Sequence, residues 1–340
     1  MRRARLAQIL RILPSVLPPW LARGERGGGA GAPTRTGPRI AVIGNCQARG
    51  IVQAMGLLAP QARVDLVPMS RLGRDPRTLD AFAARLRGYD HVFSQPFAPG
   101  FFPDGGSDAL AALVPGMRLF PAIVFSAFHP DAIYVGDLAS MAATRLTPSP
   151  LHTYHSAIAL FGHLRGLPAE RIVPLYRAEV FERLGYLAGW DPAAEDLLAA
   201  SRAVGLDLSG ELLRWIRGGA FMHTINHPRL AVLGDVAARL LTEAGLTPAP
   251  DAVESYLADE LLDGVIWPIY PAIAEVYGLP GSTTFKRRGR PGAPPRLLDL
   301  PEFVAESVAL YRRLPAGRLR SARIDAWAAT PEIGALFDRG

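Results

Sequence analysis

The stretch between residues 39 and 58 constrains the fold of this chain more than any other. It opens with an apolar run at 40–43 and breaks at Gly44. Apolar residues then recur at the spacing of a helix: Ile51, Val52, Met55, Leu57 and Leu58. An apolar run followed by a glycine and by helical periodicity predicts a buried strand, a tight turn and a helix. Cys46, the single cysteine of the chain, falls in the turn.

The position of Cys46 gives this turn two chemical uses. A thiol at the start of a helix faces free N–H groups and the positive end of the helix dipole, which favour the thiolate. The same N–H groups are able to hold a phosphate or an oxyanion. The alternative is that Cys46 is a small buried hydrophobe, as free cysteines usually are. The stretch lacks a dinucleotide-binding fingerprint and a P-loop, whereas the polar neighbours Asn45 and Gln47 favour a functional thiol.

Composition limits the class of protein. The chain has 340 residues, 49% of them hydrophobic and 20% charged, which is enough for one large domain or two smaller ones. Its formal net charge of +6 rests on arginine, because Lys286 is the only lysine among 37 basic residues. The arginines are scattered and are not interleaved with aromatic residues, so we expect no nucleic-acid partner. One cysteine excludes an intrachain disulfide and a CxxC metal site.

Residues 1–38 differ in character from the rest of the chain. Residues 1–23 place apolar residues near helical spacing with arginines among them. We expect this basic amphipathic leader to contact an anionic membrane surface, which would put a cytoplasmic protein at the inner membrane face. A signal peptide and a loosely docked leader are the alternatives. Residues 24–38 are rich in Gly, Pro, Arg and Thr, which is typical of a flexible linker.

Residues 39–150 alternate between strand and helix patterns. After the first strand and helix, further strands are predicted at 63–67, 89–94 and 119–125, with a helix at 78–86. The alternation predicts an α/β fold, a Rossmann-like parallel sheet with helices on both faces. Ligands of such sheets bind beyond the carboxyl ends of the strands. Because Cys46, Gln95 and His129 each follow such an end, we expect one cleft to gather all three.

Residues 151–340 are predicted to be mostly helical. Helical periodicity occurs at 155–164, 169–187, 193–204, 210–216 and 230–244, and in two further patterns between 297 and 336. We expect this half to pack on residues 39–150 and to form one compact unit with them.

Three histidines and one aspartate stand out as candidates for catalysis. A thiol nucleophile needs a base, usually a histidine, and an aspartate can fix the tautomer of that histidine. His129, His223 and His227 are the candidate bases and Asp131 is the candidate partner, and the sequence leaves open which pair meets. The alternative for residues 129–131 is a turn in which Asp131 bonds its own backbone.

The spacing of His223 and His227 raises the question of a metal. Residues four apart share a face on a helix. However, Thr-Ile-Asn separates the two histidines, no HExxH motif is present, and Pro228 follows directly. We therefore expect no metal. The alternative for this segment is a helix start that is capped by Asn226.

The densest basic cluster of the folded part comprises Lys286, Arg287 and Arg288. It follows a Gly-Ser-Thr-Thr sequence at 281–284. Backbone N–H groups and guanidinium groups together could bind a phosphate there. The alternative is a solvated loop.

Four of these segments occur in a specific order along the chain. They are Ile43-Gly44-Asn45-Cys46-Gln47, Ser94-Gln95, Phe128-His129-Pro130-Asp131 and the segment 221–228. In this order they resemble the WcbI family of polysaccharide biosynthesis proteins, over residues from about 39 to about 288. The turn at Cys46 also looks like the nucleophile turn of SGNH-type esterases, with a cysteine where those have a serine.

The resemblance implies a coenzyme A-binding O-acetyltransferase that uses acetyl-CoA to modify a sugar hydroxyl of a capsule or another surface polysaccharide. Its partners would be CoA and a carbohydrate acceptor. Either Cys46 carries the acetyl group, or a histidine deprotonates the sugar for direct attack on the thioester. Residues expected near the cofactor are Asn45, Gln47, Gln95, Asn226, Lys286, Arg287 and Arg288. The alternatives are an SGNH-like esterase that uses Cys46, and a non-catalytic CoA- or sugar-binding component of a polysaccharide assembly complex.

Overall fold

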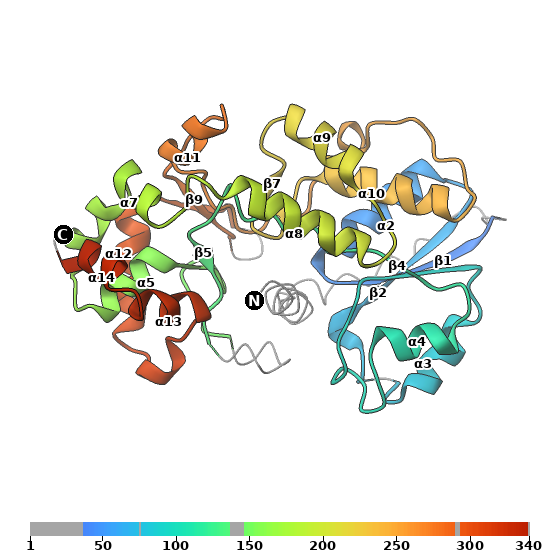
Figure 1. The fold of residues 1–340 in the computed structure, drawn as a ribbon. Helices are drawn as coiled ribbons and strands as arrows, with labels where there is room; N and C mark the ends of the chain where they lie inside the picture. The colour runs from blue at the N-terminus through green and yellow to red at the C-terminus, as the bar shows by residue number, and fades with distance from the viewer. Residues whose placement is uncertain (1–36, 75, 137–145, 290–292, 339–340) are drawn as a thin grey trace. The chain divides into compact units, whose positions relative to one another are not determined.

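The computed structural model describes residues 37–74, 76–136, 146–289 and 293–338, and these form two compact units (Figure 1). Unit 1 comprises the described residues up to Ile123 together with Leu198–Arg214 and Arg229–Leu261. Unit 2 comprises Val124–Leu197, Trp215–Pro228 and the described residues from Leu262 onward. The first division thus falls after Ile123, whereas the sequence indicated a boundary near residue 150. The predicted leader at 1–23 lies outside the described residues, as does most of the predicted linker.

Unit 1 is built on a four-stranded parallel sheet with the strand order β2-β1-β3-β4. The strands are β1 (Arg39–Gly44), β2 (Arg63–Pro68), β3 (His91–Ser94) and β4 (Arg118–Leu119). Residues 40–44 of β1 are buried, as expected for a central strand of Ile, Ala and Val, whereas β2 lies at an edge and is nowhere fully buried. The predicted α/β fold with a parallel sheet is confirmed.

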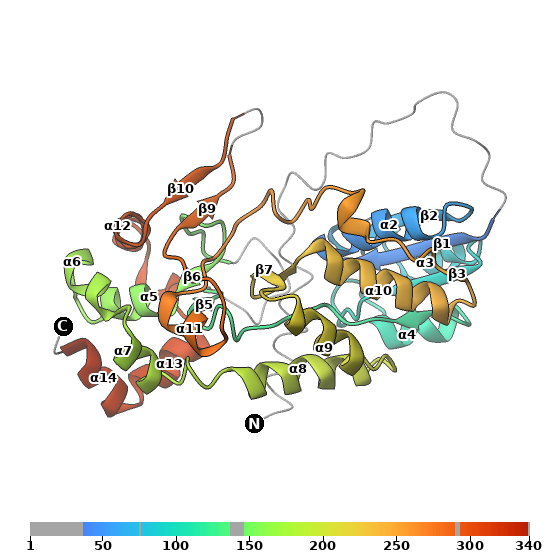
Figure 2. The same ribbon diagram turned by 90° about the horizontal axis from the view of Figure 1, so that it is seen from above.

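Helices cover both faces of this sheet. On one face lie α2 (Cys46–Leu58) and α10 (Leu230–Glu243), and on the other lie α3 (Leu79–Leu86) and α4 (Ser107–Leu113) (Figures 1 and 2). The helices α2 and α10 approach closely at Gly50, where an added Cβ would lie 2.5 Å from Cδ1 of Leu233. Unit 1 also contains the short 3-10 helices η3 (Met69–Arg71) and η6 (Val253–Ser255).

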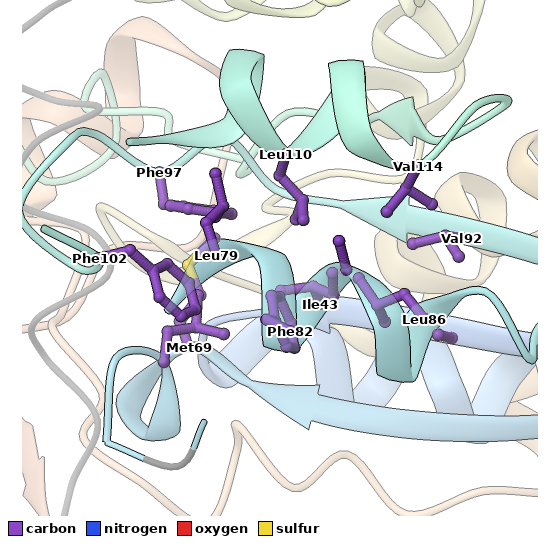
Figure 3. Packing of buried hydrophobic residues seen from close by; sticks show 13 residues of the cluster. Ile43, Met69, Leu79, Phe82, Leu86, Val92, Phe97, Phe102, Leu110 and Val114 are labelled. Carbon is purple, nitrogen blue, oxygen red and sulfur yellow. The ribbon is translucent and has the colours of Figure 1, made fainter. Parts of the chain in front are cut away.

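A hydrophobic cluster fills the space between the sheet and the helices α3 and α4 (Figure 3). The strand β1 contributes Ile43 to it, and α3 contributes Phe82 and Leu86 at helical spacing. Phe102 stacks on Phe82 with ring centroids 5.4 Å apart. This core holds the carboxyl ends of β1 and β3 in place, and therefore also the turns that follow them.

The predicted fourth strand is longer than the observed one. Only Arg118–Leu119 pairs in the sheet, although residues 119–125 have the apolar composition of a strand. The backbone groups of Ile123 bond the side chain of Gln47, and the N–H of Phe125 donates to the carbonyl of Ile225. The segment is apolar because it is buried, and its hydrogen bonds go to a side chain and a loop instead of a neighbouring strand.

Unit 2 is mostly helical, with three short antiparallel strand pairs: β5 (Ala132–Ile133) with β6 (His155–Ser156), β7 (Met222–Thr224) with β8 (His227–Pro228), and β9 (Phe285–Arg287) with β10 (Arg296–Leu298). Its helices are α5 (Ala157–Leu164), α6 (Ala169–Ile172), η5 (Val173–Leu175), α7 (Ala178–Arg183), α11 (Pro271–Val276), α12 (Leu300–Tyr311), η7 (Ala316–Arg318), α13 (Ala322–Ala328) and α14 (Pro331–Asp338). The divisions between the units fall within α8 (Trp190–Arg202) and α9 (Ser209–Arg217).

Two further differences from the sequence prediction have local causes. The single helix expected at 169–187 is divided into α6, η5 and α7, because Pro174 has no N–H to continue the helical bonds. The segment around His223 and His227 is a β-hairpin, so these residues do not share a helix face. Among the described residues, no helix has both the length and the apolar character needed to cross a membrane.

Candidate functional site

The turn that holds Cys46 has the predicted strand-turn-helix geometry. Asn45 is the N-cap of α2, and its Oδ1 accepts a hydrogen bond from the N–H of Gln47 at 2.9 Å. Cys46 is therefore the first residue of the helix. Glycine is required at position 44, since an added Cβ would lie 2.8 Å from Oε1 of Gln95 and 2.6 Å from Cβ of Ala48.

The carboxamides of this turn are buried and bonded to each other and to the backbone. Gln95 accepts a hydrogen bond from the N–H of Asn45 at 2.8 Å. Gln47 bonds both backbone groups of Ile123, with Nε2 donating to the carbonyl at 2.8 Å and Oε1 accepting from the N–H at 2.9 Å. Gln47 and Gln95 thus hold the turn together. Nδ2 of Asn45 makes no hydrogen bond to any protein group that the structure describes, so it is still able to donate one.

Burial controls the ionisation of Cys46. The side chain is a free thiol and only 5% exposed. Loss of solvation raises its pKa to about 12, although the N–H groups of Cys46 and Gln47 act in the opposite direction. The expectation that the helix start favours a thiolate is therefore wrong for this structure. The helix N–H groups are present as predicted, but desolvation outweighs them.

A cavity of about 10 Å³, the size of a single water molecule, lies beside Cys46 within unit 1. It is lined by Cys46, Arg49, Gly50, Leu230, Leu233, Asp259, Glu260 and Leu261. Nε of Arg49 lies 3.4 Å from Oε2 of Glu260, and Nε2 of Gln53 donates to Oε1 of the same carboxylate at 2.6 Å. The sulfur therefore borders a small and mostly apolar cavity that the charged pair of Arg49 and Glu260 also lines.

The N-cap of α10 is Arg229, which makes no side-chain capping hydrogen bond, and not the expected Asn226. The helix begins at Leu230, and the N–H of Leu230 donates to Oδ2 of Asp259 at 3.0 Å. Asn226 lies in the hairpin before the helix and does not cap it, which corrects the alternative considered from the sequence. Asp259 lies 29 residues further along the chain, and local spacing gave no signal for its role.

In unit 2, His129 is almost fully buried at 1% exposure. Its Nδ1 lies 3.4 Å from the carbonyl oxygen of Pro268, whereas Nε2 has no hydrogen-bond partner within the described part of the chain. Burial lowers the pKa of His129 to about 4, and the nearby His223 lowers it further, while the Pro268 and Met222 carbonyls act against this. The imidazole is therefore neutral at pH 7.

Asp131 has partners other than a histidine. Its carboxylate accepts hydrogen bonds from the N–H of Ile158 at 3.0 Å, the hydroxyl of Tyr186 at 3.1 Å and the hydroxyl of Tyr270 at 3.0 Å. Burial raises the pKa of this carboxyl. These contacts anchor the start of α5. The sequence suggested Asp131 as the partner that orients the His129 ring, but the group that contacts this ring is the carbonyl of Pro268.

The hairpin of β7 and β8 carries a second polar network. Oδ1 of Asn226 accepts from the Tyr154 hydroxyl at 2.6 Å, and its Nδ2 donates to the Tyr134 hydroxyl at 3.0 Å. The Tyr154 hydroxyl also lies 3.3 Å from Nε2 of His227. His223 is buried in β7. Nowhere in the described ranges do three or more His, Cys, Asp or Glu side chains form a group able to hold a metal ion.

The basic cluster at 286–288 begins within a strand pair and does not form the loop considered as an alternative. Nζ of Lys286 donates to the carbonyl of Leu262 at 2.6 Å. Arg287 pairs with Glu306 at 3.0 Å, and Arg296 pairs with the same carboxylate at 2.7 Å. Lys286 and Arg287 thus bond groups of unit 2, and a role of this cluster in phosphate binding stays a prediction.

The structure brings the predicted site residues together in two groups. Asn45, Cys46, Gln47 and Gln95 meet in unit 1. His129, Asp131 and the hairpin residues of 223–227 belong to unit 2. A cleft shared by Cys46 and His129 stays a prediction.

Sequence reasoning overlooked two polar residues of unit 2. Tyr154 bonds Asn226, and the fully buried His155 contacts the hydroxyl of Tyr311 and the carbonyl of Thr147, each at 3.0 Å. Tyr154 directly precedes the helix predicted at 155–164 and His155 is its first residue, and no motif marked either of them.

Comparison with known proteins gives one consistent result. A sequence model of the family described as polysaccharide biosynthesis enzyme WcbI matches residues 39–249. A solved WcbI structure matches with a TM-score of 0.61 and 17% identity, covering 89% of this chain and 98% of that one. That protein is described as a novel polysaccharide biosynthesis enzyme, in native form without a disulfide bond between coenzyme A and one of its cysteines. No curated protein matches this chain in sequence. At this identity the solved structure shows a shared fold.

Proposed function

Because the chain belongs to the WcbI family of polysaccharide biosynthesis enzymes, we propose that it transfers an acetyl group from acetyl-CoA to a sugar hydroxyl. The description of the WcbI structure mentions coenzyme A and a cysteine of that protein, which supports CoA as the donor. Cys46 is the single cysteine of this chain, and it starts the helix after the first strand of the sheet. The observation that carries the proposal is the unpartnered Nε2 of the buried His129.

His129 has the features of a general base. The carbonyl of Pro268 is an acceptor only, so Nδ1 of His129 bears the proton and Nε2 bears the lone pair. With a pKa lowered to about 4, the imidazole is unprotonated at pH 7 and ready to accept a proton. A pKa this low makes the imidazole a weaker base than one with a pKa near 7, so the proposed role of His129 rests on its unpartnered Nε2 and not on its basicity.

The buried thiol favours direct transfer over an acetylated cysteine. With its pKa raised to about 12, Cys46 is protonated at neutral pH and is a poor nucleophile. In the direct reaction the sugar oxygen attacks the thioester carbonyl while its proton moves to Nε2 of His129. The carbon–sulfur bond then breaks, and the proton passes to the CoA thiolate, which leaves the sugar ester and CoA as products. Nδ2 of Asn45 is a candidate donor to the carbonyl oxygen.

The test measures CoA release and sugar acetylation by the full chain and by His129→Asn, Cys46→Ala and Cys46→Ser. The His129 variant should lose about 10²- to 10⁴-fold in kcat, with CoA affinity unchanged within about threefold. Both Cys46 variants should retain turnover within about tenfold of the unaltered chain. Transfer abolished in both Cys46 variants, with acetylated Cys46 trapped in the unaltered chain, would overturn the direct reaction. Acetate release at full rate without a sugar would indicate an esterase instead.

A further inference from the structure

A second and much larger pocket lies at the outer edge of the sheet in unit 1. Its volume is about 690 Å³, within the range of small-molecule sites. Four consecutive residues of β2, from Asp65 to Pro68, line it. The helix α2 contributes Val52 and Gln53 from one face of the sheet, and α3 contributes residues from the other face. The pocket therefore follows the unpaired edge of β2 between these two helices.

The lining of this edge pocket is strongly basic. Among the residues that the structure describes, four arginines contribute to it, namely Arg49, Arg71, Arg74 and Arg85, together with one carboxylate, that of Asp65. The hydroxyl of Tyr89 donates to that carboxylate at 3.0 Å, and Arg63 lies 3.6 Å from it. The four arginines come from α2, from η3 and the turn after it, and from α3, so that separate elements direct positive charge to one hollow.

The pocket also has an apolar and aromatic component. Leu66 and Leu72 line it, together with the rings of Phe82, Tyr89 and Phe102. Phe82 and Phe102 are buried in the core beneath, so their stacked rings form a rigid support. Charged side chains such as arginine also keep an edge strand from pairing with another sheet. That role requires only charge and does not explain the apolar and aromatic lining. A hollow of this size, with charge and aromatic surface together, fits a ligand with both anionic and planar groups.

Arg49 connects this pocket to the Cys46 turn. Its side chain lines both the small cavity beside Cys46 and the edge pocket. Gln53, which also lines the edge pocket, is seven residues after Cys46 on α2, a rise of about 10 Å. A ligand seated in the edge pocket could therefore extend along α2 toward the thiol.

We infer that the edge pocket binds the phosphorylated nucleotide portion of a substrate. Arginine forks match phosphate oxygens, and the partly exposed Tyr89 ring with the apolar side chains of Leu66 and Val67 matches a nucleobase. Two substrates of the proposed reaction could carry this chemistry: CoA, through its nucleotide end, and a sugar acceptor attached to a nucleoside diphosphate. Whether the nucleotide belongs to CoA or to the sugar acceptor rests on the proposed function. The inference that the pocket recognises a nucleotide does not rest on it.

The experiment is calorimetric titration of the full chain with 3′-phospho-ADP, UDP, CoA and pantetheine. The pocket variant is Arg71→Gln combined with Arg85→Gln, both at exposed positions where substitution is tolerated. The matched control is Arg87→Gln, an exposed arginine that follows α3 and does not line the pocket. We expect each lost arginine to raise the Kd of the nucleotide probe about tenfold. Pantetheine affinity should not change in any variant.

Asp65→Asn provides a test of opposite sign. It removes the one carboxylate that the described residues bring to the lining but keeps an oxygen for the Tyr89 hydroxyl, so nucleotide probes should bind a few-fold more tightly. General damage to unit 1 would weaken binding instead.

The outcomes separate this inference from the proposed function. Weaker binding of 3′-phospho-ADP and CoA in the pocket variant supports the pocket and identifies CoA as the source. Weaker binding of UDP alone supports the pocket and identifies the nucleotide-linked acceptor. Normal CoA binding with no probe affected by the pocket variant overturns the inference and leaves the proposed function standing. Arginine-dependent binding of 3′-phospho-ADP or UDP, in a chain that does not bind CoA, supports the pocket and removes CoA as the donor.

Discussion

Two buried histidines of unit 2 have nearly the same electrostatics and very different surroundings. His129 and His155 are 1% and 0% exposed, and burial lowers the pKa of each to about 4. Both ring nitrogens of His155 have partners, the hydroxyl of Tyr311 and the carbonyl of Thr147. His129 has one partner, and its Nε2 has none in the described chain. A lowered pKa therefore reports burial in both, and only the unmet hydrogen bond distinguishes the candidate catalytic residue.

The largest expected effect separates these two residues by activity. His129→Asn should lower kcat by about 10²- to 10⁴-fold, which corresponds to about 3–5 kcal/mol, while urea unfolding should change little. His155→Asn should keep its turnover per folded molecule but lose about 2–3 kcal/mol of stability, because two buried partners lose a ring nitrogen. Parallel kinetics and unfolding curves measure the pair. If His155→Asn were as inactive as His129→Asn while still folded, the distinction drawn from the hydrogen bonds would be wrong.

Acid pH should affect the two residues alike. In the folded protein the pKa of each histidine is about 4, whereas in the unfolded chain it is about 6.5. Because the unfolded chain binds the proton first, the free energy of unfolding is highest above pH 6.5 and falls as the pH is lowered toward 4. Each histidine should account for about 3 kcal/mol of this loss. Asp131, whose folded pKa is raised, acts in the opposite direction as it becomes protonated. Urea unfolding between pH 7.5 and pH 4 should show a steep loss.

Either His→Asn variant should flatten that pH profile by a similar amount. A profile that stays equally steep in both variants would show that other groups cause the loss.

The same contrast between satisfied and unsatisfied groups exists in unit 1. Gln47 is fully buried, and both the oxygen and the nitrogen of its carboxamide form hydrogen bonds with the backbone of Ile123. Gln47→Leu should therefore cost about 2–3 kcal/mol, since it leaves a buried N–H and a buried carbonyl unpaired. Chemical denaturation measures this cost, and Gln53→Leu, on the same helix and half-buried, is the control. A cost below that of the control would remove Gln47 from the framework of the turn.

The smallest expected effect is that of Asn45. Its Oδ1 caps α2, so Asn45→Ala should cost about 1 kcal/mol of stability. Asn45→Asp keeps the cap but replaces the Nδ2 donor by an acceptor. If Nδ2 contacts the thioester oxygen, Asn45→Asp should lower kcat although its stability is retained. Unchanged kinetics in Asn45→Asp would exclude that contact.

The sequence was sufficient where the signal is local. The strand before Gly44, the turn at Cys46 and the helix that follows it are predicted from residues within one short stretch, and the structure confirms this order. The role of Asn45 as the N-cap of that helix was not predicted. The strand after Tyr89 and the helix around Phe82 follow from their periodicity in the same way.

It was insufficient where distant segments decide the outcome. The pKa of Cys46 depends on how deeply the turn is buried, which local helix geometry does not reveal. The apolar run at 119–125 does not pair as a strand because Gln47, more than seventy residues earlier, bonds Ile123. Asp259 accepts the hydrogen bond of the first N–H of α10 from a loop that no motif marks. The partners of His129 and His155 come from residues that are remote in the chain, so the sequence could not tell these two histidines apart.

The interleaving of the two units has a consequence for biosynthesis of the chain. Unit 1 is completed only by Arg229–Leu261, which supplies α10 and the loop whose Asp259 bonds the first N–H of that helix. On the ribosome, the sheet and α2 emerge early but lack the helix that packs on α2 at Gly50 until Leu230–Glu243 has been synthesised, and unit 1 is complete only after Leu261. The Cys46 side of the nascent sheet must remain uncovered over that interval, while the first segments of unit 2 emerge beside it. Truncation before residue 261 should therefore yield a chaperone-dependent, aggregation-prone fragment.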